Sequence, residues 1–216
     1  MIPFKINGQK HLIPTVWSDV TYHQYIKLIT TPNNLIDYIA VFVDIPRETL
    51  ATAKLNNVER IALALSFLTI PPKFEAKPTK MVGPYYVPKD ITLESLGQFE
   101  DLRALITQMP SGTTPEECIQ ISELYLSSCS IYIQKIADGK YDPQRVEAVK
   151  DKLRNYSCVE VIQTGSFFFY KLLNTSQGIT HRSQSILPRL KKLLLGFPGF
   201  QKSLDSLLRS LKLQNK

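Results

Sequence analysis

The feature that most constrains this chain is a proline-rich stretch, residues 71–90, which contains five prolines. Proline has no backbone N–H and clashes inside a helix, so it is excluded from helix interiors and from central strands. The end of the stretch, Val82-Gly83-Pro84-Tyr85-Tyr86-Val87-Pro88, is typical of an extended arm or an edge strand. We therefore expect a proline-rich arm that separates two helical parts of the chain.

The N-terminal residues predict a β-hairpin between Phe4 and Pro14. Asn7-Gly8 is a preferred pair for a two-residue type I′ turn, and it lies between two short apolar segments, 4–6 and 11–13. A two-stranded hairpin is not stable alone in water. We therefore expect it to rest on the helices or to pair with another chain, and we predict contact with a neighbouring protein chain.

Helix start and stop signals account for most of the remaining chain. Thr21 and Gln24 form a capping box, and Pro115 and Pro143 stand at first helical positions. Predicted helices cover residues 22–30, 34–42, 47–54, 57–70, 92–109, 115–137 and 143–173, the last with a break near Asn155. The predicted core contains Leu28, Ile36, Ile39, Ile61, Leu65, Leu68, Leu105, Ile121, Leu124 and Ile162.

The expected fold class is therefore mainly α, a helical bundle with an N-terminal β-hairpin and an extended proline-rich arm. Four regions follow from the patterns. They are a hairpin plus helical subdomain (1–70), the proline-rich arm (71–90), a helical bundle (91–180) and a basic amphipathic C-terminal segment (181–216).

The C-terminal segment holds the whole charge excess of the chain. Residues 1–180 carry 18 Lys+Arg and 18 Asp+Glu, whereas residues 181–216 carry 8 and 1. Its leucines recur on one helical face, which is typical of a helix that docks. Three interpretations stay open: a solvated helix packed on its own domain, a helix docked in a groove of a neighbouring subunit, or a segment that binds phosphates or lipid.

Aromatic and amphipathic residues supply the candidate partner contacts. The run Phe167-Phe168-Phe169-Tyr170 covers every face of a predicted helix, so it is either buried between several helices or forms an oligomer contact. Tyr85-Tyr86 belongs either to a protruding arm or to a packed loop. The candidates are Phe4, Ile6, Leu12, Trp17, Tyr85, Tyr86, Phe168, Tyr170, Lys191, Lys192, Phe200, Leu204, Leu207, Leu208, Arg209 and Leu211.

No residue pattern indicates catalysis, a cofactor or a metal site. The chain has no Gly-rich phosphate loop, no GxSxG and no HExxH, and its three cysteines and three histidines lack zinc-ligand spacing. We therefore expect a protein that is not an enzyme and whose cysteines are free in a reducing compartment. No secretory signal and no membrane span are evident, which predicts a protein made and kept in the cytoplasm or in something assembled there.

One segment suggests a family. The pattern Ile13-Pro14-x-x-Trp17-x-Asp19-Val20-Thr21-x-x-Gln24-Tyr25-x-x-Leu28, after a short hairpin, resembles the opening of small helical neck and tail proteins of crAss-like and related phages that infect Bacteroidetes. The resemblance covers residues 4–28 of the chain. It carries over no catalytic residue.

The resemblance implies a virion structural protein, assembled in the host cytoplasm, such as a homo-oligomeric ring near the portal that contacts other phage structural proteins. The alternatives are a tail assembly chaperone that is absent from the mature particle, and a nucleic-acid-associated packaging protein. Any nucleic-acid contact is expected to be nonspecific, because no base-reading or stacking signature accompanies the basic residues.

Overall fold

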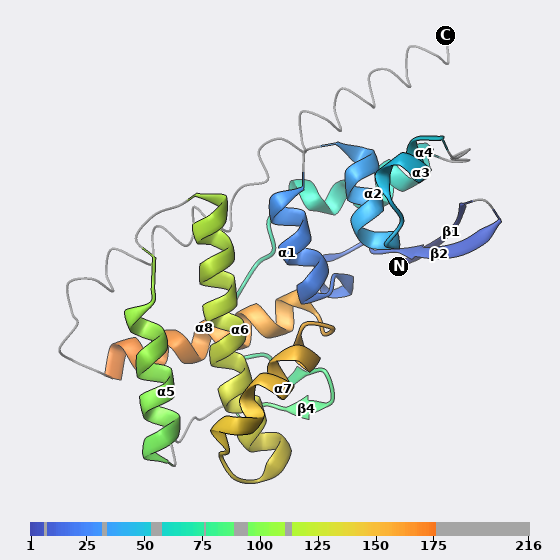
Figure 1. The fold of residues 1–216 in the computed structure, drawn as a ribbon. Coiled ribbons are helices and arrows are strands. Elements are labelled where there is room, and N and C mark those ends of the chain that lie inside the picture. The colour runs from blue at the N-terminus through green and yellow to red at the C-terminus, as the bar shows by residue number, and fades with distance from the viewer. Residues whose placement is uncertain are drawn as a thin grey trace.

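The computed structural model describes residues 1–6, 8–31, 34–52, 58–75, 77–88, 95–110 and 114–175. Asn7 of the predicted turn, Thr92 at the predicted start of a helix and the whole segment 181–216 lie outside the described residues. The described part is mainly helical, with an N-terminal antiparallel hairpin, which confirms the expected fold class (Figure 1).

The described residues form eight α-helices, two 3-10 helices and two sheets of two strands each. The N-terminal elements are β1 (Ile2–Ile6), β2 (Gln9–Ile13), η1 (Trp17–Asp19), α1 (Tyr22–Thr30), α2 (Leu35–Val43), α3 (Arg47–Thr52), α4 (Val58–Ala64) and η2 (Leu65–Thr69). The later elements are β3 (Met81–Val82), β4 (Tyr85–Tyr86), α5 (Leu96–Thr107), α6 (Pro115–Asp138), α7 (Pro143–Leu153) and α8 (Cys158–Thr175).

Local capping fixes several helix starts where the sequence predicts them. The Thr21 hydroxyl accepts a hydrogen bond from the Gln24 amide, and the Gln24 side chain bonds back to the Thr21 amide, so α1 begins at Tyr22. α6 begins at Pro115 with the same arrangement between Thr114 and Glu117. α5 begins later than predicted, at Leu96, because the Ser95 hydroxyl caps it.

α6 is the central helix of the C-terminal part, and α5, α7 and α8 pack around it (Figure 1). α8 crosses α6 very closely at Gly165. A Cβ placed on Gly165 would lie 1.9 Å from the Tyr125 carbonyl oxygen, so only glycine permits this approach. The crossing brings the aromatic residues of α8 against α6.

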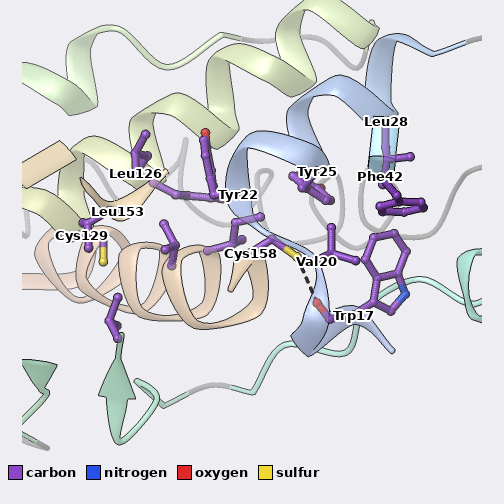
Figure 2. Packing of buried hydrophobic residues seen from close by; sticks show 14 of the residues in the cluster. Trp17, Val20, Tyr22, Tyr25, Leu28, Phe42, Leu126, Cys129, Leu153 and Cys158 are labelled. Carbon is purple, nitrogen blue, oxygen red and sulfur yellow. Dashed lines mark hydrogen bonds between the residues drawn. The ribbon is translucent and has the colours of Figure 1, made fainter. Parts of the chain in front are cut away.

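The two predicted helical parts share one hydrophobic core rather than folding around separate ones. The junction runs from η1 and the start of α1 to the start of α8. The Tyr22 amide donates to the Tyr156 carbonyl at 2.9 Å, and the Cys158 amide donates to the Val20 carbonyl at 2.8 Å. Figure 2 shows residues of α1, α6 and α8 meeting at this junction.

Most of the predicted core is confirmed. Eight of the ten positions are buried, and Ile36 and Leu105 are only partly buried against the core. The buried positions are Leu28, Ile39, Ile61, Leu65, Leu68, Ile121, Leu124 and Ile162.

The proline-rich arm is extended, but it lies along α8 instead of projecting from the body. Three polar side chains on one face of α8, Glu160, Gln163 and Thr164, hold its backbone. The hydrogen bonds join the Glu75 amide to Gln163 Oε1 (3.2 Å), Gln163 Nε2 to the Lys77 carbonyl (2.9 Å), the Thr79 amide to Thr164 Oγ1 (3.3 Å) and the Gly83 amide to Glu160 Oε2 (2.9 Å). Val82 and Val87 of the arm are buried.

Candidate partner-binding surface

The hairpin β1–β2 has one face toward the core and one toward solvent. The two-residue loop of the hairpin sets the register, in which Ile6 pairs with Gln9 and Ile2 pairs with Ile13. Ile6 and Ile13 are buried against the core. The opposite face consists of exposed residues that also pair across the strands, Pro3 with Leu12 and Lys5 with Lys10. The hairpin therefore presents an outward face with two apolar and two cationic side chains.

Large apolar side chains are exposed around the base of the hairpin. Leu12 is 57% exposed and Ile70 is 61% exposed, and Met1 and Val16 are exposed to a similar degree. The Met1 amino group lies 3.4 Å from the Thr15 hydroxyl, next to Val16. We call Met1, Leu12, Val16 and Ile70 the hairpin-base surface.

Trp17 brings Ile70 to this part of the molecule without being exposed itself. Its indole N–H donates to the Ile70 carbonyl at 2.7 Å, and its ring makes edge contacts with Tyr25 and Phe67. Only 9% of its surface is exposed. The structure thus places Trp17 under the hairpin-base surface, as its support.

Ile6, Trp17 and Phe168 belong to the core instead of to a contact surface. Each was a candidate partner contact from its apolar or aromatic character, and each is buried by other elements of its own chain. Burial removes their side chains from any partner in this fold. Phe4 is partly buried and packs against the core, with its ring 5.9 Å from the His11 ring.

The aromatic run of α8 packs between helices of the same chain. Phe168 stacks on Tyr132 of α6 at a centroid distance of 3.8 Å, and Phe169 meets Tyr125 edge to face. The hydroxyls of Tyr170 and Tyr125 lie 2.9 Å apart, and burial raises the pKa of Tyr170 to about 12. The structure thus favours burial between helices over an oligomer contact for this run.

Tyr85 and Tyr86 differ in exposure, although they are neighbours in β4. Tyr85 is partly buried, and its ring meets Tyr156 at 6.4 Å. Tyr86 is exposed and pairs in register with the exposed Met81. Of the two tyrosines, Tyr86 is the one available for a partner.

Half of the candidate contacts belong to the C-terminal segment, which the structure does not describe. These contacts remain predictions from the sequence. These residues are Lys191, Lys192, Phe200, Leu204, Leu207, Leu208, Arg209 and Leu211.

The structure contains an ion-pair cluster around Glu123 that was not predicted from the sequence. Arg154 donates to both Glu123 carboxylate oxygens, at 2.8 and 2.9 Å, and the Tyr22 hydroxyl donates to one of them at 3.2 Å. Burial and the adjacent Glu123 raise the pKa of Tyr22 well above its usual value. The three groups tie α1, α6 and the end of α7 together, and the Lys150 ammonium of α7 lies 3.9 Å from the same carboxylate. No local sequence pattern connects residues so far apart.

In the described part of the chain, the cysteines and the possible metal ligands form no further candidate site. Burial raises the pKa of the Cys129 and Cys158 thiols well above the usual value, which keeps both protonated. The Cys158 thiol lies 3.5 Å from the Trp17 carbonyl (Figure 2). Within the described ranges, no group of three or more His, Cys, Asp or Glu side chains could hold a metal ion. None of the described helices has the length and apolar character needed to cross a membrane.

Comparison with known proteins gives no relative. No family model matches the chain, and neither a curated protein nor a solved structure is significantly similar to it.

Proposed function

We propose that this chain is a non-enzymatic structural protein of a phage virion, a ring-forming neck or tail component that joins the portal to the tail. The observation that carries the proposal is the hairpin-base surface. Four large apolar side chains are exposed around a hairpin whose other face is anchored in the core. Exposed apolar side chains that lie near one another are typical of interaction sites.

Burial of this surface on contact would favour assembly, in proportion to the part of each side chain that is still exposed. Full burial of one large apolar side chain contributes about 1.5–3 kcal/mol. Four such side chains repeated at every interface of a closed ring would add up around the ring. Ordering of long side chains opposes this gain, but the hairpin is already fixed by Ile6 and Ile13, so little of it must be ordered on contact.

The basic C-terminal segment has the second role in this proposal. Its leucine face and its lysines suit docking on a neighbouring subunit or an adjacent assembly protein. In a ring, such a segment would link successive subunits. Under this proposal the protein is located in the virion, after assembly in the host cytoplasm.

The oligomeric state tests the hairpin-base surface. Leu12→Ser with Val16→Ser should abolish the oligomer in native mass spectrometry, while circular dichroism and thermal melting stay near wild type because both side chains are exposed. Leu96→Ser with Leu63→Ser is the matched control, since these side chains are also exposed apolar residues but lie on α5 and α4. Loss of the oligomer in the control pair, or its survival in the first pair, would contradict the assignment.

Substitution is a cleaner test than deletion of the hairpin. Removing residues 1–13 would also remove Ile6 and Ile13 from the core and would therefore destabilise the monomer. The exposed pair of substitutions leaves both isoleucines in place, so a loss of assembly can be separated from a loss of folding.

Two further measurements separate the alternatives. Mass spectrometry of purified particles should find the chain at ring stoichiometry; its absence from particles together with its presence in infected cells would identify an assembly chaperone.

Removing residues 197–216 should weaken oligomerisation. If the truncated chain assembles fully but no longer retains DNA at physiological salt, the segment is a nucleic-acid element and the chain a packaging protein.

A further inference from the structure

The outward edge of β2 has backbone groups that no described residue pairs with. Ile6 and Gln9 close the two-residue loop as a hydrogen-bonded pair, and such pairs alternate with non-bonded ones along a hairpin. Lys10 and Leu12 therefore point their N–H and C=O groups away from β1. No backbone hydrogen bond from the described residues reaches them.

The two edges of the hairpin are not equivalent. On β1, the outward positions are Pro3 and Lys5, and proline offers no N–H to an added strand. On β2, both outward residues keep their donor and acceptor. The β2 edge is thus the one on which a further strand can form a full ladder.

The side chains above this edge define the chemistry of the strand that fits. Lys5 and Lys10 lie directly opposite each other on the outward face, where like charges are destabilising. Within the described residues, neither has a carboxylate at salt-bridge distance. A strand paired with β2 would place one residue beside Lys10 and, two positions along, another beside the exposed Leu12. An acidic residue suits the first position and an apolar one the second.

We propose that the β2 edge binds an extended, acidic segment of a partner protein by strand addition, with an acidic and an apolar residue at alternate positions on one face. The proposal deepens the proposed function and rests on the hairpin being an assembly surface. A second copy of the hairpin is excluded as the added strand, since lysines would face lysines. A nucleic acid fits less well, because Leu12 and Val16 would face a sugar–phosphate backbone.

Amide NMR spectra of the full chain test this with peptides as probes. The binding peptide has Glu and Val two positions apart, with Thr between them, so that both lie on one face of a strand. The control peptide has the same composition with Glu and Val adjacent, so that they lie on opposite faces. The binding peptide should shift and protect the amides of Lys10 and Leu12, and the control peptide should bind up to about fivefold more weakly.

Charge reversal on the protein gives the second half of the test. Lys10→Glu should weaken binding of the acidic peptide by about tenfold. The same variant should bind more tightly to a peptide with Lys in place of Glu. Lys73→Glu, an exposed lysine on the arm with the same change in net charge, should leave binding unchanged. Equal weakening by both variants, or shifts away from residues 9–13, would overturn the proposal. So would a short DNA duplex that shifts the Lys10 and Leu12 amides when the acidic peptide does not.

The outcome can be separated from that of the proposed function. If the wild-type chain forms its oligomer and the peptides leave the β2 amides unshifted, strand addition is wrong and the proposed function stands. If the peptides bind as described and no oligomer forms, the edge still has its acidic partner and the ring is wrong.

Discussion

The two hairpins of this chain have similar turns and opposite surroundings. Each has a two-residue loop containing a glycine with positive φ, Gly8 at 84° and Gly83 at 55°. A Cβ on Gly8 would meet nothing within 4 Å, whereas one on Gly83 would lie 2.6 Å from the Tyr156 ring. Both hairpins are supported from outside their own ladders. In β3–β4 the turn glycine itself is covered by the Tyr156 ring, whereas β1–β2 is held by the buried Ile6 and Ile13 and its turn glycine faces open space.

The largest expected difference comes from alanine at the two turn glycines. Gly8→Ala should cost about 1–2 kcal/mol, because only the left-handed backbone is penalised. Gly83→Ala adds the clash with Tyr156 and should cost about 3–5 kcal/mol in the free energy of unfolding. Urea denaturation of the two variants measures both values. Equal costs would show that the turn of β3–β4 is no more confined than that of β1–β2.

The contacts of the arm with α8 can be removed one at a time. Thr164→Val keeps the shape of a fully buried side chain but removes the hydroxyl that lies 2.7 Å from the Thr79 hydroxyl and accepts from the Thr79 amide. We expect a loss of about 1–3 kcal/mol. Thr15→Val, at the exposed N-terminal contact of the first hairpin, is the control and should cost less than about 0.5 kcal/mol. Chemical denaturation with matched slopes checks both.

Alkaline pH should weaken the α6–α8 support of the second hairpin. Burial raises the pKa of Tyr170 to about 12, above its usual value near 10 in an unfolded chain. A raised pKa means that the stabilisation is complete below pH 10 and is lost as the pH rises toward 12, by up to about 2 kcal/mol. Denaturation midpoints at pH 9, 10 and 11 measure the decline. Tyr170→Phe should decline less steeply, and a parallel decline would exclude Tyr170 as the cause.

The smallest effect is a difference in hydrogen exchange. The Val87 amide donates to the Lys80 carbonyl at 2.9 Å, so its exchange should be slowed at least about tenfold relative to a free amide. The outward amides of Lys10 and Leu12 should exchange almost as fast as in an unfolded peptide. Hydrogen-exchange mass spectrometry with short labelling times measures the difference in exchange rate between the amides of the two hairpins. Strong protection of the β2 amides in the isolated monomer would mean that this edge is already paired.

Local signals predicted the first hairpin and most helices. Asn7-Gly8 between apolar segments set the register of β1–β2, and α1 begins and ends where its capping box and Pro32 indicate. The break near Asn155 is also confirmed, since α7 ends at Leu153 and α8 begins at Cys158. These features depend on neighbours in the sequence, which a single chain reveals directly.

The surroundings of the second hairpin could not be predicted in the same way. The arm that carries this hairpin contacts Glu160, Gln163 and Thr164 over separations of 77 to 88 positions, and it does so through side chain to backbone bonds that leave no periodic pattern. For the same reason the indole of Trp17 was a candidate contact, while its actual partner is a carbonyl 53 positions away. On the candidate surface, Leu12 was predicted, whereas Met1, Val16 and Ile70 became evident only from their exposure in the fold.

The hydrogen bonds between η1, α1 and the start of α8 also set an order of events during synthesis. Trp17 and Cys158 are in contact although 141 positions separate them in the chain. At the usual ~5–20 residues per second, a ribosome needs about 7–28 s to add the second after the first. For that time the nascent hairpin has no finished core beneath it. A polypeptide that stops short of α8 therefore lacks part of the surface against which residues 1–70 pack. We expect it to be held by chaperones or degraded rather than to accumulate as a folded fragment.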